Sequence, residues 1–127
     1  MAFQGITYHE QGFNNHLNTV DFIKKYIFPG SNLISVNHVI STVKEFTDLS
    51  MVHFEDITKH YAETLRLWRE NYISVLPSIK DMGFSDEFLR IWEYYFIYCE
   101  AGFRERFIGN VQIVMAKPKN KDIQIDY

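Results

Sequence analysis

The side chains that most often bind metals or act as nucleophiles are few and scattered in this sequence. Five histidines occur, and no two of them are four residues apart or form an HExxH motif: His9, His16, His38, His53 and His60. Because two ligands on one helical turn require such spacing, the sequence predicts no metal site. Cys99 is the single cysteine, so an intrachain disulfide is excluded, and we expect a core position for it rather than a nucleophile.

The glycines and the charge balance exclude two further classes of function. A nucleotide loop needs closely spaced glycines so that backbone amides can approach the phosphates, whereas the six glycines of this chain stand apart from one another. The formal net charge is -3, with acidic and basic residues interspersed, which gives no basic field for nucleic acid. We therefore expect no nucleotide loop within the chain and no nucleic-acid partner.

Aromatic side chains are the remaining candidates for a site. They make up 17% of the 127 residues, and apolar residues make up 46%, which predicts one compact unit with a thick core or a ring-lined pocket. Tyr61 lies in a stretch of helical periodicity, HYAETLRLW. Composition alone favours a core tyrosine whose hydroxyl reaches solvent, and a hydrogen-bonding role in a site is the alternative.

Hydrophobic periodicity predicts the elements that must position these side chains. We expect, in chain order, a strand over 1–8, a helix over 15–27 that ends at the Pro29-Gly30 turn, a helix over 36–46 capped by Ser35, a strand over 49–57, a long helix over 61–79 that Pro77 kinks or shortens, a helix from Ser85 to about Arg106, and a strand over 111–115. The last strand ends at Lys117-Pro118, before a polar tail over 119–127.

Strands and helices in this order indicate an α/β fold whose sheet is incomplete. Three strands are expected, whereas five or six are usual for an independent sheet. The first strand also begins without a capping or linker residue, which is unusual for the terminus of a domain. We therefore expect residues 1–118 to form part of a larger domain whose upstream half is missing.

Several separated segments resemble one enzyme family, in the right order. They read QGI at 4–6, IFPG followed by Ser31, YAETLRLW at 61–68 and CEAGFR at 99–104. The cyclopropane-fatty-acid synthases and mycolic-acid cyclopropane synthases carry a strand, an IFPGG turn, a Y-x-x-T-L-x-x-W helix and a CAE-x-FR helix in these places. The resemblance extends from Met1 to about Pro118. It implies the C-terminal, substrate-side part of a class I S-adenosylmethionine methyltransferase with a Rossmann-like fold.

The resemblance implies methyl transfer from S-adenosylmethionine to the cis double bond of a phospholipid acyl chain, then proton loss and ring closure. The family's proton acceptor is a bound bicarbonate, held by groups that match the Tyr61 hydroxyl and the Ile6 backbone. Gln4 stands where the family usually has histidine. Because glutamine hydrogen-bonds but does not titrate, cyclopropanation, simple methylation and another methyl transfer all stay open.

For the substrate, the resemblance places Phe22 and Phe28 near the acyl tunnel and Cys99 in the pocket wall. Plain packing is an equal alternative for both phenylalanines. The family's glycine-rich cofactor motif and ribose-binding acid would precede Met1. We therefore expect catalysis to need the missing N-terminal half, which is either supplied by a second chain or lost in a gene break.

Two further hypotheses stay open beside the lipid enzyme. One is a non-catalytic interaction or lipid-binding module that self-associates as a homo-oligomer, and the other is a methyltransferase for a small amine. The lysines near the C-terminus suit either anionic lipid heads or a merely solvated tail: Lys117, Lys119 and Lys121. The expected location is the cytoplasm, with peripheral contact at the inner membrane face.

Overall fold

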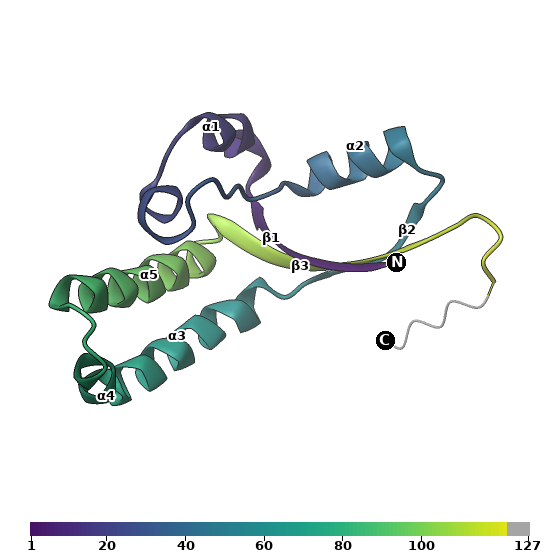
Figure 1. Cartoon of the computed structure of the whole chain (residues 1–127). Helices are drawn as coiled ribbons and strands as arrows, with labels where there is room; N and C mark the ends of the chain where they lie inside the picture. The colour runs from purple at the N-terminus through teal and green to yellow at the C-terminus, as the bar shows by residue number, and fades with distance from the viewer. Residues whose placement is uncertain (122–127) are drawn as a thin grey trace.

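The computed structural model describes residues 1–121 and shows a three-stranded sheet with helices on both faces (Figure 1). Strand β1 covers Ala2–Tyr8, β2 covers Ser50–Asp56 and β3 covers Ile108–Ala116. The order is β1-β3-β2, and β3 runs antiparallel to both neighbours. The outer strands β1 and β2 therefore point the same way. The predicted α/β class with three strands is confirmed.

One face of the sheet packs against helix α2 (Val36–Phe46), which runs along that side in Figure 1. Side chains alternate between the faces of a strand, and three buried residues of β3 point toward α2: Val111, Ile113 and Met115. The Ser35 hydroxyl accepts a hydrogen bond from the His38 backbone amide at 3.1 Å. The helix over 36–46 and its serine cap are as predicted.

The opposite face carries a helical hairpin that extends well beyond the sheet (Figure 1). Helix α3 (Thr58–Ser74) and helix α5 (Asp86–Arg104) pack side by side and are joined through α4 (Leu76–Asp81). Pro77 lies at the start of α4, where its missing amide breaks no helical hydrogen bond. The long helix predicted over 61–79 is accordingly shortened near its end.

The predicted helix over 15–27 is wrong as one continuous element. After a short 3₁₀ turn, η1 (Glu10–Gly12), helix α1 (Phe13–Asn18) ends at Thr19, which is extended, and a separate π-helical turn, η2 (Ile23–Ile27), follows. The Asn18 amide group and the Thr19 hydroxyl donate to carbonyls four residues earlier, at 2.8 and 2.9 Å. Such side-chain bonds compete with the regular helix.

A second set of polar contacts holds the broken segment in place. The Asp21 carboxylate accepts from the Lys24 backbone amide at 2.9 Å, beside the start of η2. The Lys24 ammonium donates to the carbonyls of His16 and Thr19. The apolar spacing that predicted one helix is still present, but these contacts decide the path of the backbone.

The last strand is longer than expected, because β3 already pairs with Tyr8 of β1 at Ile108. Of the predicted tail over 119–127, residues 122–127 lie outside the described residues. Within residues 1–121, no helix combines the length and apolar character that crossing a membrane would require.

Candidate functional site

Tyr61 lies in the first turn of α3, and the sheet fixes where that helix begins. The Thr58 backbone amide donates to the Asp56 carboxylate at 2.9 Å. The Thr58 hydroxyl accepts from the backbone amide of Asn110 in β3 at 3.1 Å. The Tyr61 ring then meets Phe103 of α5 edge-on, with 5.0 Å between the ring centroids. The end of β2 thus places the tyrosine between the two helices of the hairpin.

Asp56 is also bound from the other end of the hairpin. The guanidinium of Arg106, just after α5, pairs with its carboxylate. Burial alone would raise the pKa of Asp56, but hydrogen bonds from Thr58 and Arg106 lower that pKa from 3.8 to about 2. The Asp56 carboxylate therefore stays ionised at neutral pH and links the start of α3 to the segment just after α5.

Tyr61 belongs to an apolar cluster, here called the Tyr61 cluster. Its fully buried residues are Ala62, Leu65 and Phe103, and five partly buried residues pack against them: Ile6, Tyr61, Phe96, Cys99 and Ile108. Three of the six predicted site residues are therefore brought together by the fold. They come from β1, α3 and α5.

The backbone amide of Ile6 points to the outer edge of β1. Met1 exchanges both backbone hydrogen bonds with Met115 of β3, each 2.8 Å long. Tyr8 instead donates away from the sheet, to the Ile34 carbonyl at 2.7 Å. Because amides alternate in direction along a strand, the Ile6 amide faces outward like that of Tyr8. The position is suitable for a backbone hydrogen-bond donor to a ligand.

Gln4 lies on the same face of β1 as Ile6 but is exposed, and the Tyr61 cluster does not include it. It stands opposite Gln112 of β3, whose side-chain amide donates to the Gln4 Oε1 atom at 2.9 Å. Glu55 of β2 is the next residue across the sheet. The three side chains form a polar row, and the N–H donors of the Gln4 amide are not used in this contact.

Cys99 and Tyr95 form a polar contact inside the hairpin. Burial raises the pKa of Cys99 to about 11, although a hydrogen bond with Tyr95 opposes the shift. Burial also raises the pKa of Tyr95 to about 12, with contributions from Cys99 and Tyr61. Both groups stay protonated at neutral pH, so the thiol has little nucleophilic character. Cys99 therefore contributes a small, polarizable side chain to the packing of the Tyr61 cluster.

Phe22 and Phe28 flank the π-helical turn η2 and both face rings of α5. Phe22 meets Tyr94 edge-on at 4.6 Å between centroids, and Phe28 meets Tyr95 edge-on at 6.0 Å. The two phenylalanines therefore form one aromatic wall with α5. Tyr95 connects this wall to Cys99.

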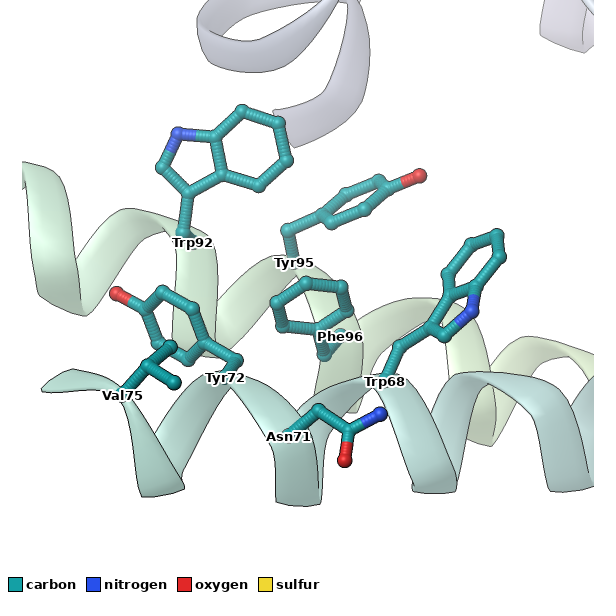
Figure 2. A pocket seen from close by; sticks show the side chains of 7 residues that line it. All are labelled: Trp68, Asn71, Tyr72, Val75, Trp92, Tyr95 and Phe96. Atoms are coloured by element: carbon teal, nitrogen blue, oxygen red, sulfur yellow. The ribbon is translucent and has the colours of Figure 1, made fainter. Parts of the chain in front are cut away.

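An open groove of about 450 Å³ runs between α3 and α5 (Figure 2). We call it the aromatic groove, and its lining residues are Trp68, Asn71, Tyr72, Val75, Trp92, Tyr95 and Phe96. None of the six predicted site residues lines it. Two lining residues also belong to the regions described above. Tyr95 is part of the aromatic wall, and Phe96 packs on the Tyr61 cluster.

Two residues of this region were missed by the sequence prediction of site residues. Tyr95 could have been found, because it lies on the same helical face as Cys99, one turn away. Asn110 of β3 gave no signal in the sequence. It is 1% exposed, and its Oδ1 atom has no hydrogen-bond partner among the described residues. Within residues 1–121, no group of three or more potential metal ligands comes together.

Solved structures define the class of this fold. The chain matches the mycolic acid cyclopropane synthase CmaA1, determined with SAH and CTAB, with a TM-score of 0.79 at 23% identity over 92% of this chain and 44% of that chain. For the cyclopropane synthase MmaA2 from Mycobacterium tuberculosis, the TM-score is 0.78 at 24% identity, over 91% of this chain and 43% of that chain. The structure is therefore part of a cyclopropane synthase methyltransferase fold, as the sequence predicted.

Sequence comparisons identify the family. The family model for mycolic acid cyclopropane synthetase matches residues 1–113. Tuberculostearic acid methyltransferase of Mycobacterium tuberculosis is 40% identical over 114 residues, which are 88% of this chain and 26% of the relative. Cyclopropane-fatty-acyl-phospholipid synthase of Escherichia coli K12 is 29% identical over 109 residues, which are 86% of this chain and 28% of the relative. The chain belongs to the mycolic acid cyclopropane synthetase family and spans about a quarter of the length of these relatives.

Proposed function

We propose that this chain is the substrate-side part of an S-adenosylmethionine-dependent methyltransferase that acts on unsaturated acyl chains of phospholipids. Relatives named as a tuberculostearic acid methyltransferase and a cyclopropane-fatty-acyl-phospholipid synthase support the reaction class. The observation that carries the proposal is the convergence of Tyr61, Cys99, the two phenylalanine rings that flank η2 and the rings of α5 on one region.

The aromatic wall would bind the acyl chain and exclude water from its double bond. Phe28 and Tyr95 meet edge-on, so ring faces as well as edges are presented to neighbouring groups. Positive charge that develops on an acyl carbon has no polar partner in such surroundings. Ring faces stabilise a cation by about 0.5 to 2 kcal/mol each, which gives the aromatic residues a chemical role beyond packing.

The proton released by the acyl chain needs an acceptor, and we assign this role to a bound bicarbonate. The Tyr61 hydroxyl and the outward-facing Ile6 amide would hold the anion, with the Gln4 amide as a further donor. The Gln4 Oε1 atom already accepts from Gln112, which leaves the N–H groups of Gln4 for the ligand. Because glutamine does not titrate, it would position the anion rather than take the proton.

S-adenosylmethionine would supply the methyl group, but residues 1–121 alone do not fit this cofactor. Gly30 and Gly83, the two glycines with positive φ, are single turn residues. No closely spaced glycines accompany them to form a nucleotide loop. We therefore derive no step through the cofactor and assign its surface to a further half, in the same protein or in a second chain. The assembled enzyme would act in the cytoplasm, in peripheral contact with the membrane that holds its substrate.

The test is isothermal titration with S-adenosylmethionine, first of the purified chain and then of the chain mixed with the preceding half of a relative. We expect no heat from the chain alone and saturable binding by the mixture. The mixture should then transfer labelled methyl groups to vesicles of a monounsaturated phospholipid. Cofactor binding by the isolated chain would contradict our placement of the cofactor surface.

A second candidate function is a non-catalytic interaction or lipid-binding module that self-associates. Exposed apolar side chains on α2 and β2 favour it, since Phe46 is 73% exposed and Met51 and Phe54 are more than one third exposed. Large exposed apolar side chains mark an interface where they gather into a patch. Titration without heat in both arms, together with a stable dimer in sedimentation, would support this function over the enzyme.

A further inference from the structure

Gln112 of β3 hydrogen-bonds the glutamine that we assign to the anion site, and we propose that Gln112 is a positioning residue of that site. By donating to the Gln4 Oε1 atom, it holds the Gln4 carboxamide with its N–H groups toward the bound bicarbonate. The inference rests on the proposed function, because it takes that anion site as given. Gln112 is not among the residues that the family resemblance places in the site.

The strand register brings the two glutamine side chains into the closest kind of cross-strand pair. Met1 and Met115 exchange both backbone hydrogen bonds, and such pairs alternate along an antiparallel ladder with pairs that exchange none. Gln4 lies three residues further along and is opposite Gln112, so the two glutamines form a pair of the second kind. Side chains are closer together in these pairs. The 2.9 Å hydrogen bond between the two carboxamides agrees with this position.

The direction of this hydrogen bond matters because the two ends of a carboxamide differ. The oxygen only accepts hydrogen bonds, and the NH₂ group only donates them. An anion is bound by donors, so a glutamine serves an anion site only when its NH₂ group faces the ligand. Because the Gln112 amide binds the Gln4 oxygen on the β3 side, the NH₂ group is the end of Gln4 that is left for the anion.

The neighbouring position of β3 also suggests that this stretch serves a site. On the side of the sheet that faces the hairpin, Asn110 is opposite Ile6 and Gln112 is opposite Gln4. Two carboxamides therefore lie across from the two β1 residues that we assign to the anion. Asn110 is 1% exposed, and its Oδ1 atom has no partner among the described residues. Burying such a group costs stability, which packing alone does not explain.

Glu55, the third member of the polar row, is not suited to the same task. It is opposite Gln112 rather than Gln4, and an ionised carboxylate has no proton to donate to the Gln4 oxygen. Gln112 also carries no charge, so it orients Gln4 without repelling or attracting the anion itself. A neutral donor between Gln4 and Glu55 is therefore the member of the row that fits a positioning role.

Binding of bicarbonate to the 127-residue chain tests the inference without any need for catalysis. We would titrate the isotope-labelled chain with sodium bicarbonate at constant pH and ionic strength. Nuclear magnetic resonance would follow the backbone amide of Ile6 and the carboxamide of Gln4, with sodium chloride as the control salt. We expect both signals to shift saturably with bicarbonate and not with chloride.

A double-substitution cycle isolates the positioning role. Methionine has nearly the length of glutamine but no N–H group, so Gln112→Met should raise the half-saturating bicarbonate concentration about tenfold, as expected for one hydrogen bond to a charged group. Gln4→Met should raise it by a similar factor. The double variant should bind no more weakly than Gln4→Met, because Gln112 acts only through Gln4. Gln11→Met, at an exposed position of η1, is the control, and circular dichroism checks that all variants fold.

The outcomes separate this inference from the proposed function. Additive effects of the two substitutions, or unchanged binding by Gln112→Met, would make the glutamine pair a surface contact even if the assembled enzyme methylates lipid. A non-additive cycle without methyl transfer by the assembled enzyme would keep the positioning role and remove the reaction. An Ile6 signal that ignores bicarbonate, or that responds equally to chloride, would overturn the anion site and the role of Gln112 with it.

Discussion

The two faces of the sheet differ in the polarity of the side chains that β3 directs toward the helices. Toward α2, the three buried side chains of β3 are all apolar, and apolar residues of β1 and α2 pack on them. Toward α3 and α5, the intervening residues of β3 include Asn110 and Gln112, one fully buried and one in a polar row. A buried polar atom without a partner costs about 1 to 3 kcal/mol. Such exceptions are expected where a protein keeps groups for a site.

The largest expected effect tests the face of the sheet that packs on α2, here called the packing face. Ile113→Ala removes a side chain that is 1% exposed and lies between Val111 and Met115 in the buried row of β3 that packs on α2. We expect a loss of about 2 to 5 kcal/mol in the free energy of unfolding, from lost burial and the cavity left behind. Urea denaturation measures it, with Ile73→Ala on exposed α3 surface as the control. A loss below 1 kcal/mol would mean that the α2 face is loosely packed.

The next effect tests the opposite face, where we expect function to change while stability does not. Tyr61→Phe removes a hydroxyl and keeps the ring that packs on Phe103. In the assembled enzyme, methyl transfer should fall about 100-fold, with the free energy of unfolding within about 1 kcal/mol. Tyr94→Phe keeps the ring that meets Phe22 in the aromatic wall and removes only the hydroxyl of an exposed residue, so it should leave both unchanged. Equal activity of the two variants would make Tyr61 a packing residue.

The packing face was also the easier one to predict from the sequence. Alternation of Val111, Ile113 and Met115 indicates a strand with one buried side, and the stripe of α2 indicates the helix that covers it, because both patterns are local. The position of Tyr61 at the start of a helix came from local periodicity too. Its closeness to Ile6 and Cys99 did not, since that depends on how three distant elements meet.

The polar exceptions could not be predicted for the same reason. The side-chain bonds of Asn18 and Thr19 that end α1 oppose an apolar pattern that fits one continuous helix. Asn110 lies within a strand pattern that gives no sign of its burial. The aromatic groove arises only when α3 and α5 pack, so the helical face of α5 predicted rings without predicting the space between them.

A smaller effect tests whether charge fixes the junction between β2 and α3. Asp56 has a folded pKa of about 2, below its ordinary 3.8, so its contribution is present above pH 3.8 and is lost as the pH falls toward 2. Because both partners are partly exposed, we expect only about 1 kcal/mol from it. Acid denaturation of Asp56→Asn should lack this component. An unchanged acid profile would show that Thr58 and Arg106 do not stabilise the carboxylate.

The smallest effect concerns His16, which supports the segment that carries Phe22 and Phe28. The His16 ring is 5% exposed, stacks on Tyr8 at 4.4 Å, and its Nε2 atom accepts from the Leu33 backbone amide at 3.1 Å. Burial, and secondly the Lys24 ammonium, lower the pKa of His16 below its ordinary 6.5, while Asp21 opposes the shift. A protonated ring would also lose the acceptor that the Leu33 amide needs.

The sign follows from where the proton binds first. Below pH 6.5 the unfolded chain takes up a proton that the folded His16 resists, so stability falls as the pH drops from 6.5 through the lower folded pKa. His16→Gln should remove this slope in thermal unfolding, and His60→Gln, at an exposed position, should keep it. An identical slope in both variants would mean that His16 does not cause the pH dependence. The segment of Phe22 and Phe28 would then be held without His16, and its polar contacts would add no more to stability than the apolar contacts of the α2 face.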